Sequence, residues 1–279
     1  MKLKRSSRLI DMTGYLLQHP HQIVSLSYFS DRYDSAKSSI SEDLSIVKEN
    51  FESQGIGRLE TIAGASGGVK YIPFMDKKDA EAFLRLLSEQ LSQTDRLLPG
   101  GYLYMTDILG QPSFINEIGK MIASVYSSHS IDVVMTMETK GIPLAFAAAS
   151  QLNVPVIIVR RSIKVTEGST VSINYVSGSS KRIQTMVLPR RSLIPGSKVL
   201  IIDDFMKAGG TMKGMANLLK EFDAEVAGMA VLVETKSEEP KLVDNYLSLL
   251  KLSMTEEEEK FVIEHGNYFQ YYNERIFSK

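Results

Sequence analysis

The chain has 279 residues, with 32 basic and 33 acidic side chains, a formal charge of −1 and 43% hydrophobic residues. These values are typical of a globular protein and exclude a uniformly basic nucleic-acid-binding protein. The absence of cysteine excludes zinc fingers, iron–sulfur clusters and cysteine nucleophiles. Because the sequence has no export signal and no apolar run of roughly 20 residues, we expect a cytoplasmic protein without a membrane partner.

The amino-terminal part of the chain shows three stretches with helical spacing of apolar residues. They lie at residues 5–18, 27–33 and 35–53. Asp34 or Ser35 is the expected cap of the third helix, since short polar side chains accept hydrogen bonds from the first free N–H groups.

Two short extended runs follow, at residues 57–62 and 68–72, on either side of the glycine-rich residues 64–68. They predict a β-hairpin. Three helices followed by a hairpin is the order of a winged helix, and Pro73 marks a plausible boundary. We therefore expect a winged-helix domain at residues 1–74.

The remainder of the chain, residues 75–279, predicts a second domain of the α/β class. A linking helix is expected at residues 77–93. After it, apolar strands at 131–137, 154–159, 199–202 and 226–233 alternate with helices at 142–152 and 211–222, and an exposed hairpin is expected at 171–175 and 183–188 with its tip at Gly178. Strands that alternate with helices indicate a parallel sheet.

The most specific motif is VLIIDDFMKAGGT at residues 199–211, where an apolar strand runs into Asp203 and Asp204. Ligands bind above the carboxyl ends of parallel strands, and two adjacent carboxylates there can accept hydrogen bonds from ribose hydroxyls. The glycines that follow let backbone N–H groups approach a phosphate at a helix start, where the helix dipole favours an anion. We therefore favour a ribose 5-phosphate site over a solvated turn.

This motif resembles the phosphoribosyl pyrophosphate signature of type I phosphoribosyltransferases. The resemblance implies that Thr139, Lys140 and Gly141, after the strand at 131–137, form the loop that binds pyrophosphate. Some purine enzymes of that family carry a base-binding acid where this chain has Lys207. Lysine cannot take that role but can strengthen anion binding. The expected effector-binding residues are Tyr102, Thr139, Lys140, Gly141, Asp203, Asp204, Phe205, Lys207, Ala208, Gly209, Gly210 and Thr211.

Two parts of this expected site have alternative interpretations. Phe205, with Tyr102, could stack on a base, or both rings could pack in the core. The basic hairpin with Lys164, Lys181 and Arg182 resembles the mobile loop of the family, or it is simply a solvated hairpin.

The amino-terminal part carries the residues expected at DNA. The start of a recognition helix faces the bases, basic side chains near it contact phosphates, and a wing reaches the minor groove. Residues 1–74 hold about as many acids as bases, so charge alone leaves DNA binding undecided. The expected DNA-binding residues are Lys4, Arg5, Arg8, Ser35, Lys37, Ser38, Ser39 and Lys70.

A second resemblance covers about residues 2–252. The stretches HPHQIVSLSYFSDRYDSAKSSISEDL and QGIGRLETIAGASGGVKYIP, together with VLIIDDFMKAGGT, are similar to the purine operon repressors of the Bacillus type. The resemblance implies a homodimer in which a winged helix is fused to a phosphoribosyltransferase-like domain that senses its ligand without catalysis. It implies repression of purine biosynthesis genes through double-stranded operator DNA, with release by phosphoribosyl pyrophosphate.

Several alternatives stay open from the sequence. The chain could instead be an active purine phosphoribosyltransferase with an appended domain. Release could come from direct competition with DNA or from a conformational change. An Mg²⁺ ion is compatible with the effector, and a purine nucleotide with several phosphates could compete for the pocket. The run from Glu256 to Glu259 has no assigned role.

Overall fold

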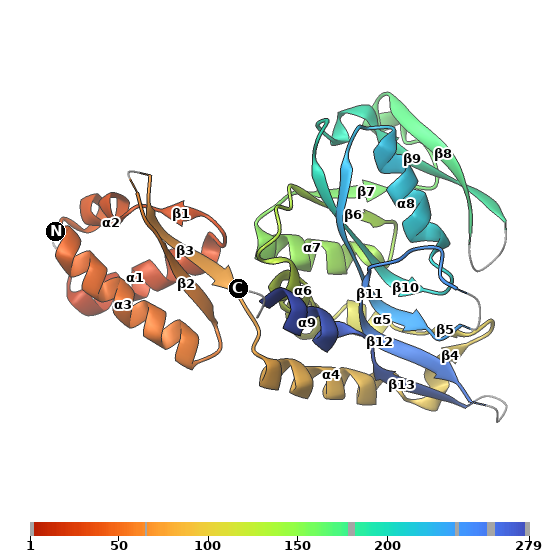
Figure 1. Ribbon diagram of the computed structural model, residues 1–279, viewed down its shortest axis with the longest axis horizontal. Coiled ribbons are helices and arrows are strands. Elements are labelled where there is room, and N and C mark those ends of the chain that lie inside the picture. The colour runs from red at the N-terminus through yellow and green to blue at the C-terminus, as the bar shows by residue number, and fades with distance from the viewer. Residues whose placement is uncertain (1–2, 65, 178–181, 238–239, 256–259, 277–279) are drawn as a thin grey trace. The chain divides into compact units, whose positions relative to one another are not determined.

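The computed structural model describes residues 3–64, 66–177, 182–237, 240–255 and 260–276 (Figure 1). The chain divides into two compact units. One contains Met1–Asp76 with Gln151–Asn153, and the other contains Lys77–Ser150 with Val154–Lys279. The predicted hairpin tip at Gly178, with Lys181, and the acidic run at 256–259 lie outside the described residues. Among the described residues, no helix combines the length and apolarity that crossing a membrane requires.

The first unit is a winged helix, which confirms the predicted fold of the amino-terminal part. Its elements are α1 (Arg5–Gln18), β1 (Ile23–Val24), α2 (Leu26–Tyr33), α3 (Lys37–Ser53), β2 (Gly57–Ile62) and β3 (Gly68–Pro73). The strand β3 lies in the centre of the sheet and pairs antiparallel with β1 and β2. The sequence did not predict β1, because two residues are too few to show an alternating pattern.

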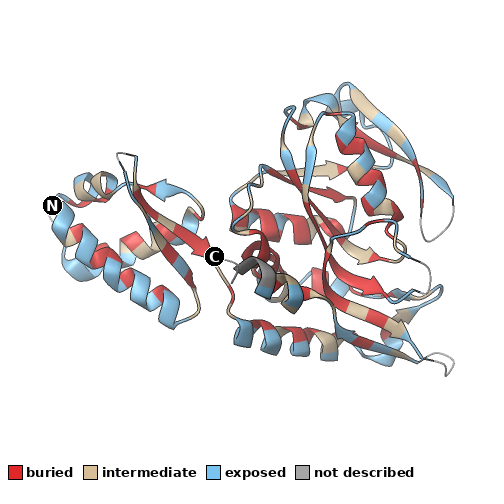
Figure 2. Ribbon diagram, in the orientation of Figure 1, coloured by how far each residue is buried: buried red, intermediate tan, exposed pale blue. Residues whose placement is uncertain are grey.

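The core of this unit forms where the apolar faces of the three helices meet the sheet (Figure 2). Met12, Leu16, Phe29, Ile40 and Phe51 are all completely buried there. Their spacing along each helix places them on one face, so burial of that face stabilises the helices against the hairpin.

The predicted cap of α3 was wrong. The helix begins at Lys37, and its N-cap residue, Ala36, makes no side-chain hydrogen bond. Asp34 instead ends α2 in the left-handed conformation, with φ 47°. Ser35 lies in the turn, where its hydroxyl donates to the Tyr33 carbonyl. The polar pair therefore reverses the chain between the helices, which is a second common use of Asp and Ser.

The second unit has a larger set of elements. In chain order they are α4 (Lys77–Leu91), β4 (Leu97–Leu98), β5 (Tyr102–Leu103), α5 (Thr106–Leu109), α6 (Pro112–Tyr126), β6 (Val133–Met137), α7 (Gly141–Leu152), β7 (Val156–Val159), β8 (Thr170–Val176), β9 (Ile183–Pro189), β10 (Lys198–Met206), α8 (Gly210–Lys220), β11 (Glu225–Thr235), β12 (Leu247–Met254), β13 (Phe261–His265) and α9 (Tyr268–Ile276). Short 3-10 turns lie at Thr94–Arg96, Val165–Glu167 and Arg190–Ser192.

The main sheet of this unit has the strand order β13-β12-β11-β10-β6-β7. All neighbours are parallel except β13, which runs antiparallel to β12. The predicted α/β class with a mainly parallel sheet is confirmed. The strands β8 and β9 form a separate antiparallel hairpin, as predicted.

The central strands are buried on both faces. Met135, Ile201 and Val231 pack with residues of α8 in one hydrophobic cluster. Val134 and Leu200, which alternate with them and point to the opposite face, are also completely buried. This double burial explains the continuous apolar runs in the sequence. It also leaves the carboxyl ends of the parallel strands as the edge where polar side chains gather.

Candidate functional site

A cavity of about 620 Å³ lies at the carboxyl ends of β6 and β10. Its lining brings together the loop after β6, the end of β10, the loop that enters α8, and β5 of the short β4–β5 hairpin. Every residue predicted to bind the effector lines this cavity except Gly141; those that do are Tyr102, Thr139, Lys140, Asp203, Asp204, Phe205, Lys207, Ala208, Gly209, Gly210 and Thr211.

Gly141 lies beside the cavity, at the start of α7. A Cβ atom at this position would lie 2.2 Å from Thr136 Oγ1 and 3.5 Å from Asp203 Oδ1. The strand end, the helix start and the acid therefore approach closely only because residue 141 is glycine.

The two carboxylates lie near the end of β10, still within the strand that pairs with β11. Asp203 is 7% exposed, and its Oδ1 accepts a hydrogen bond of 3.0 Å from the backbone N–H of Asp204. Burial raises the pKa of the Asp203 carboxyl well above its usual value, and the charge of Asp204 raises it further. Burial also raises the pKa of Asp204, while its hydrogen bond with Asp203 and the charge of Lys140 oppose this rise.

This raised pKa predicts that Asp203→Asn increases the melting temperature at neutral pH. A carboxyl whose pKa is higher in the folded than in the unfolded state costs stability above the folded pKa. That cost disappears as the pH falls and the folded carboxyl takes up its proton. Thermal unfolding of both proteins should therefore show a gain at about pH 7.5 that shrinks towards about pH 5. The exposed Asp244→Asn is the matched control, and a gain that is the same at both pH values would contradict the prediction.

The loop into α8 is shaped to expose backbone N–H groups. Gly209 has φ 83° and occupies the N-cap position of α8, where it makes no side-chain hydrogen bond. The N–H groups of the first turn therefore lack a capping side chain, and the positive end of the helix dipole faces the cavity. The hydroxyl of Thr211 lies in this first turn. The arrangement can bind a phosphate group.

Lys207 lines the cavity, and its ammonium group contacts a backbone carbonyl and an aromatic ring. Its Nζ donates a hydrogen bond of 2.7 Å to the carbonyl of Gly100 and lies 5.3 Å from the centre of the Tyr102 ring. The rings of Tyr102 and Phe205 have centroids 5.7 Å apart. Tyr102 is 39% exposed, so it lines the cavity rather than filling the core. The two rings offer a surface on which a planar base can stack.

Several residues of the cavity were missed by the sequence interpretation. Glu138 accepts hydrogen bonds from Arg160 Nη1 at 3.2 Å and from the Arg161 backbone N–H at 2.8 Å. These bonds lower the pKa of Glu138. The sequence contained a signal for this part of the site: Arg160 and Arg161 directly follow the apolar strand β7, just as Asp203 and Asp204 follow the apolar residues of β10. The additional lining residues are Met137, Glu138, Arg161, Tyr175, Ser177, Gln184, Met206 and Met212.

The residues expected at DNA lie at the start of α1, at the start of α3 and on β3. Lys4, Lys37 and Ser38 are exposed, and Ser35 and Ser39 are half-buried. Lys70 lies on β3 and forms an ion pair of 3.3 Å with Glu60 of β2. The first turn of α3 is therefore accessible for contact with a groove.

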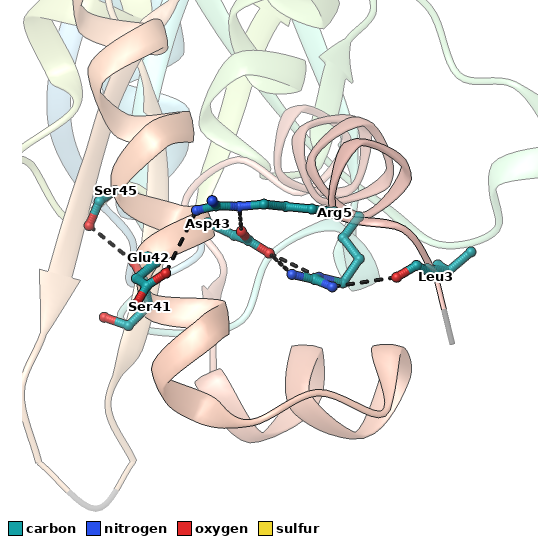
Figure 3. Close-up of polar contacts among 7 residues, drawn as sticks. Leu3, Arg5, Ser41, Glu42, Asp43 and Ser45 are labelled. Atoms are coloured by element: carbon teal, nitrogen blue, oxygen red, sulfur yellow. Dashed lines mark hydrogen bonds and ion pairs between the residues drawn. The ribbon is translucent and has the colours of Figure 1, made fainter. Parts of the chain in front are cut away.

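Besides Lys70, two of the predicted basic residues form ion pairs within the unit itself. Arg5 and Arg8 of α1 both bind the carboxylate of Asp43 on α3, at 2.9 Å and 2.8 Å. Figure 3 shows the contact between Arg5 and Asp43. The Asp43 side chain is 1% exposed and that of Arg8 is 11% exposed, whereas Arg5 keeps 53%. Arg5 also lies 3.8 Å from Glu42 (Figure 3). These contacts favour a structural role for Arg8 over the expected contact with DNA.

Family models match most of the chain. A model described as bacterial purine repressor, N-terminal, matches residues 4–73. A model described as phosphoribosyl transferase domain matches residues 105–268, which include the cavity.

Bacterial proteins resemble the chain over nearly its whole length. The purine biosynthesis transcriptional repressor of Bacillus subtilis (strain 168) is 60% identical over 99% of this chain and 97% of that protein. The purine biosynthesis transcriptional activator of Lactococcus lactis subsp. lactis (strain IL1403) is 48% identical over 90% of this chain and 92% of that protein. Among solved structures, the adenine phosphoribosyltransferase of Rhodothermus marinus DSM 4252 matches 62% of this chain and 99% of its own, with a TM-score of 0.52 and 23% identity. This last likeness concerns the fold alone.

Proposed function

Since this chain belongs to the bacterial purine repressor family, whose members regulate transcription of purine biosynthesis genes, we propose that it represses those genes and that phosphoribosyl pyrophosphate releases it from its operator. Residues 1–74 bind the double-stranded operator in the cytoplasm. Residues 75–279 bind the effector and join two chains in a homodimer. Relatives of high identity are named regulators, so the phosphoribosyltransferase fold serves regulation and not catalysis here.

One observation carries the proposal for the effector. The buried Asp203 and its neighbour Asp204 lie in the same cavity as the amide-lined start of α8. Carboxylates accept hydrogen bonds from hydroxyls, and helix starts bind phosphates. A ribose 5-phosphate satisfies both at once, and Thr139 and Lys140 line the cavity where a pyrophosphate on the same ribose would bind.

The proposed interface with DNA uses the exposed start of α3. Lys37, Ser38 and Ser39 face the major groove, with Ser35 in the preceding turn. Lys4 and Arg5 contact phosphates, and the hairpin with Lys70 reaches the minor groove. By linkage, an effector that weakens operator binding is itself bound more weakly in the presence of operator, by the same factor.

The experiment that tests the proposal measures operator binding by fluorescence anisotropy, with and without phosphoribosyl pyrophosphate. We expect the affinity for a purine promoter fragment to fall at least about tenfold when the effector saturates, which corresponds to a typical coupling free energy. Pyrophosphate alone or ribose 5-phosphate alone should lower the operator affinity less than phosphoribosyl pyrophosphate does. An operator affinity that the effector leaves unchanged would reject the proposal. Transcription in vitro from the same fragment distinguishes repression from the activation for which the Lactococcus lactis relative is named.

We also expect no transfer of phosphoribosyl groups to a purine base. Lysine occupies position 207, and its ammonium group is bound to the Gly100 carbonyl, so it offers no acid for a base nitrogen. Pyrophosphate release should stay at background with adenine, guanine, hypoxanthine or xanthine, while a purine phosphoribosyltransferase assayed in parallel shows turnover. Measurable turnover would favour the alternative of an enzyme with an appended domain.

Two further ligands fit the cavity in this proposal. Among the described residues, no three His, Asp or Glu side chains are grouped to hold a metal ion. An Mg²⁺ ion would therefore need oxygen atoms of the effector besides the carboxylates. A purine nucleotide with several phosphates would compete for the cavity, with its base against Tyr102 and Phe205 and its phosphates at the start of α8.

A further inference from the structure

Lys241 and Leu242, which are distant in sequence from the loop that enters α8, donate hydrogen bonds to its backbone carbonyls. Lys241 Nζ donates hydrogen bonds to the backbone carbonyls of Lys207 and Thr235. The backbone N–H of the next residue, Leu242, donates to the carbonyl of Ala208 at 2.8 Å. Neither Lys241 nor Leu242 lines the cavity. Two consecutive carbonyls of the loop are therefore bound on the side away from the cavity.

This pattern determines where the loop N–H groups point. In a trans peptide the C=O and N–H bonds are antiparallel. Because the carbonyls of Lys207 and Ala208 face Lys241 and Leu242, the N–H groups of Ala208 and Gly209 face the opposite side, which is the cavity. In the described part of the chain, neither N–H donates to a backbone carbonyl. The carbonyl of Gly209 accepts from Lys213 within α8, so the N–H of Gly210 also points out of the helix start.

Leu242 and Val243, which follow Lys241, also pack closely against the loop. A Cβ atom on Gly209 would lie 3.0 Å from Val243 Cγ2 and 3.6 Å from the Leu242 nitrogen. The loop and these two residues are thus in van der Waals contact. Burial lowers the pKa of Lys241, and the two carbonyls provide the hydrogen bonds that a partly buried ammonium group requires.

We infer that Lys241 is a positioning residue for anion binding: it holds the Lys207 carbonyl so that the loop amides face the phosphate of the ligand. This inference rests on the proposed function, because it assigns the 5′-phosphate of the effector to this loop. Without the ammonium group, the peptide between Lys207 and Ala208 can rotate, since the remaining donor, Thr235 Oγ1, is 3.4 Å away. The loop then has to be ordered when the ligand binds, which costs affinity.

The test is a calorimetric titration of Lys241→Met, which keeps most of the side chain but removes the donor. The matched control is Lys236→Met, because Lys236 is an exposed lysine that directly follows β11. Hydrogen bonds from charged donors are worth enough to predict a loss of about tenfold to a hundredfold in affinity for phosphoribosyl pyrophosphate and ribose 5-phosphate. Pyrophosphate alone should bind both variants as it binds the wild type, because its loop lies after β6.

The outcomes separate the inference from the proposed function. If the wild-type chain binds no phosphoribosyl pyrophosphate, both the proposed function and this inference are rejected. If the wild type binds and Lys241→Met binds equally well, only the positioning role fails. An equal loss for pyrophosphate and ribose 5-phosphate would show a general structural role and would also overturn it. If Lys241→Met does not fold, Lys241→Leu, which also removes the donor, serves for the same titration.

Discussion

A chain with Asp203→Ala and Asp204→Ala is expected to bind its operator with at least wild-type affinity and to stay bound when phosphoribosyl pyrophosphate is added. Each hydrogen bond from a ribose hydroxyl to a carboxylate is worth about 1.5–3 kcal/mol. Loss of both should weaken effector binding by at least about a hundredfold. Anisotropy titration of the bound operator with effector measures the loss, and calorimetry measures the effector affinity directly.

The fold should tolerate this change. The raised pKa of Asp203 shows that burial of its charge costs stability, so its removal takes away an unfavourable contribution. The winged helix has a core of its own, which contains none of these residues. The matched control is Glu221→Ala with Glu225→Ala, two exposed acids of the same unit, which alters the net charge equally. Normal release of the double aspartate variant would reject the assigned site.

The same variant distinguishes the two routes of release. If effector and DNA compete for one positive surface, removal of two negative charges should tighten operator binding and steepen its dependence on salt. If the effector acts through a conformational change, operator affinity without effector should remain at the wild-type value. Operator titrations at several salt concentrations separate these results.

Replacement of Asp43 should have the largest effect on the winged helix. Asp43→Ala leaves Arg8 with a nearly buried charge and no carboxylate, and breaking such a pair costs about 3–5 kcal/mol. The free energy of unfolding of a unit of this size is only of the order of this loss. We therefore expect the variant to lose operator binding and the first unit to melt early, while the second unit still binds the effector. Thermal unfolding combined with effector titration measures both.

Glu42 provides a matched control on the same helix. Its side chain is 72% exposed and lies 3.8 Å from Arg5. Exposed pairs contribute less than about 1 kcal/mol, so Glu42→Ala should melt close to the wild type. A combined Arg8→Met and Asp43→Leu variant removes both charges together and should recover stability. An Asp43→Ala protein as stable as the wild type would contradict the structural role of the pair, and lost operator affinity in a stable combined variant would return Arg8 to the DNA interface.

Local signals were sufficient for most of the elements and for the centre of the site. The helices and strands that the sequence predicted have apolar faces that repeat within one element. The string from Val199 to Thr211 places strand, acids, glycines and helix start in immediate succession, so its backbone geometry follows from neighbouring residues. The strand β1 was not predicted because two residues show no pattern. The helix α6 and the strand β12 do carry apolar residues at regular spacing, but the sequence interpretation did not assign them.

What the amino-acid sequence by itself determined was the two fold classes, the central strands and helices of each unit, and the motif residues that line the cavity. Tertiary structure alone decided which charged side chains are free to act. Arg8 meets Asp43 across 35 positions, Lys241 meets Lys207 across 34, and Lys207 meets Gly100 across 107. No periodic pattern encodes these pairs, because each depends on how separate elements pack and on the burial that results.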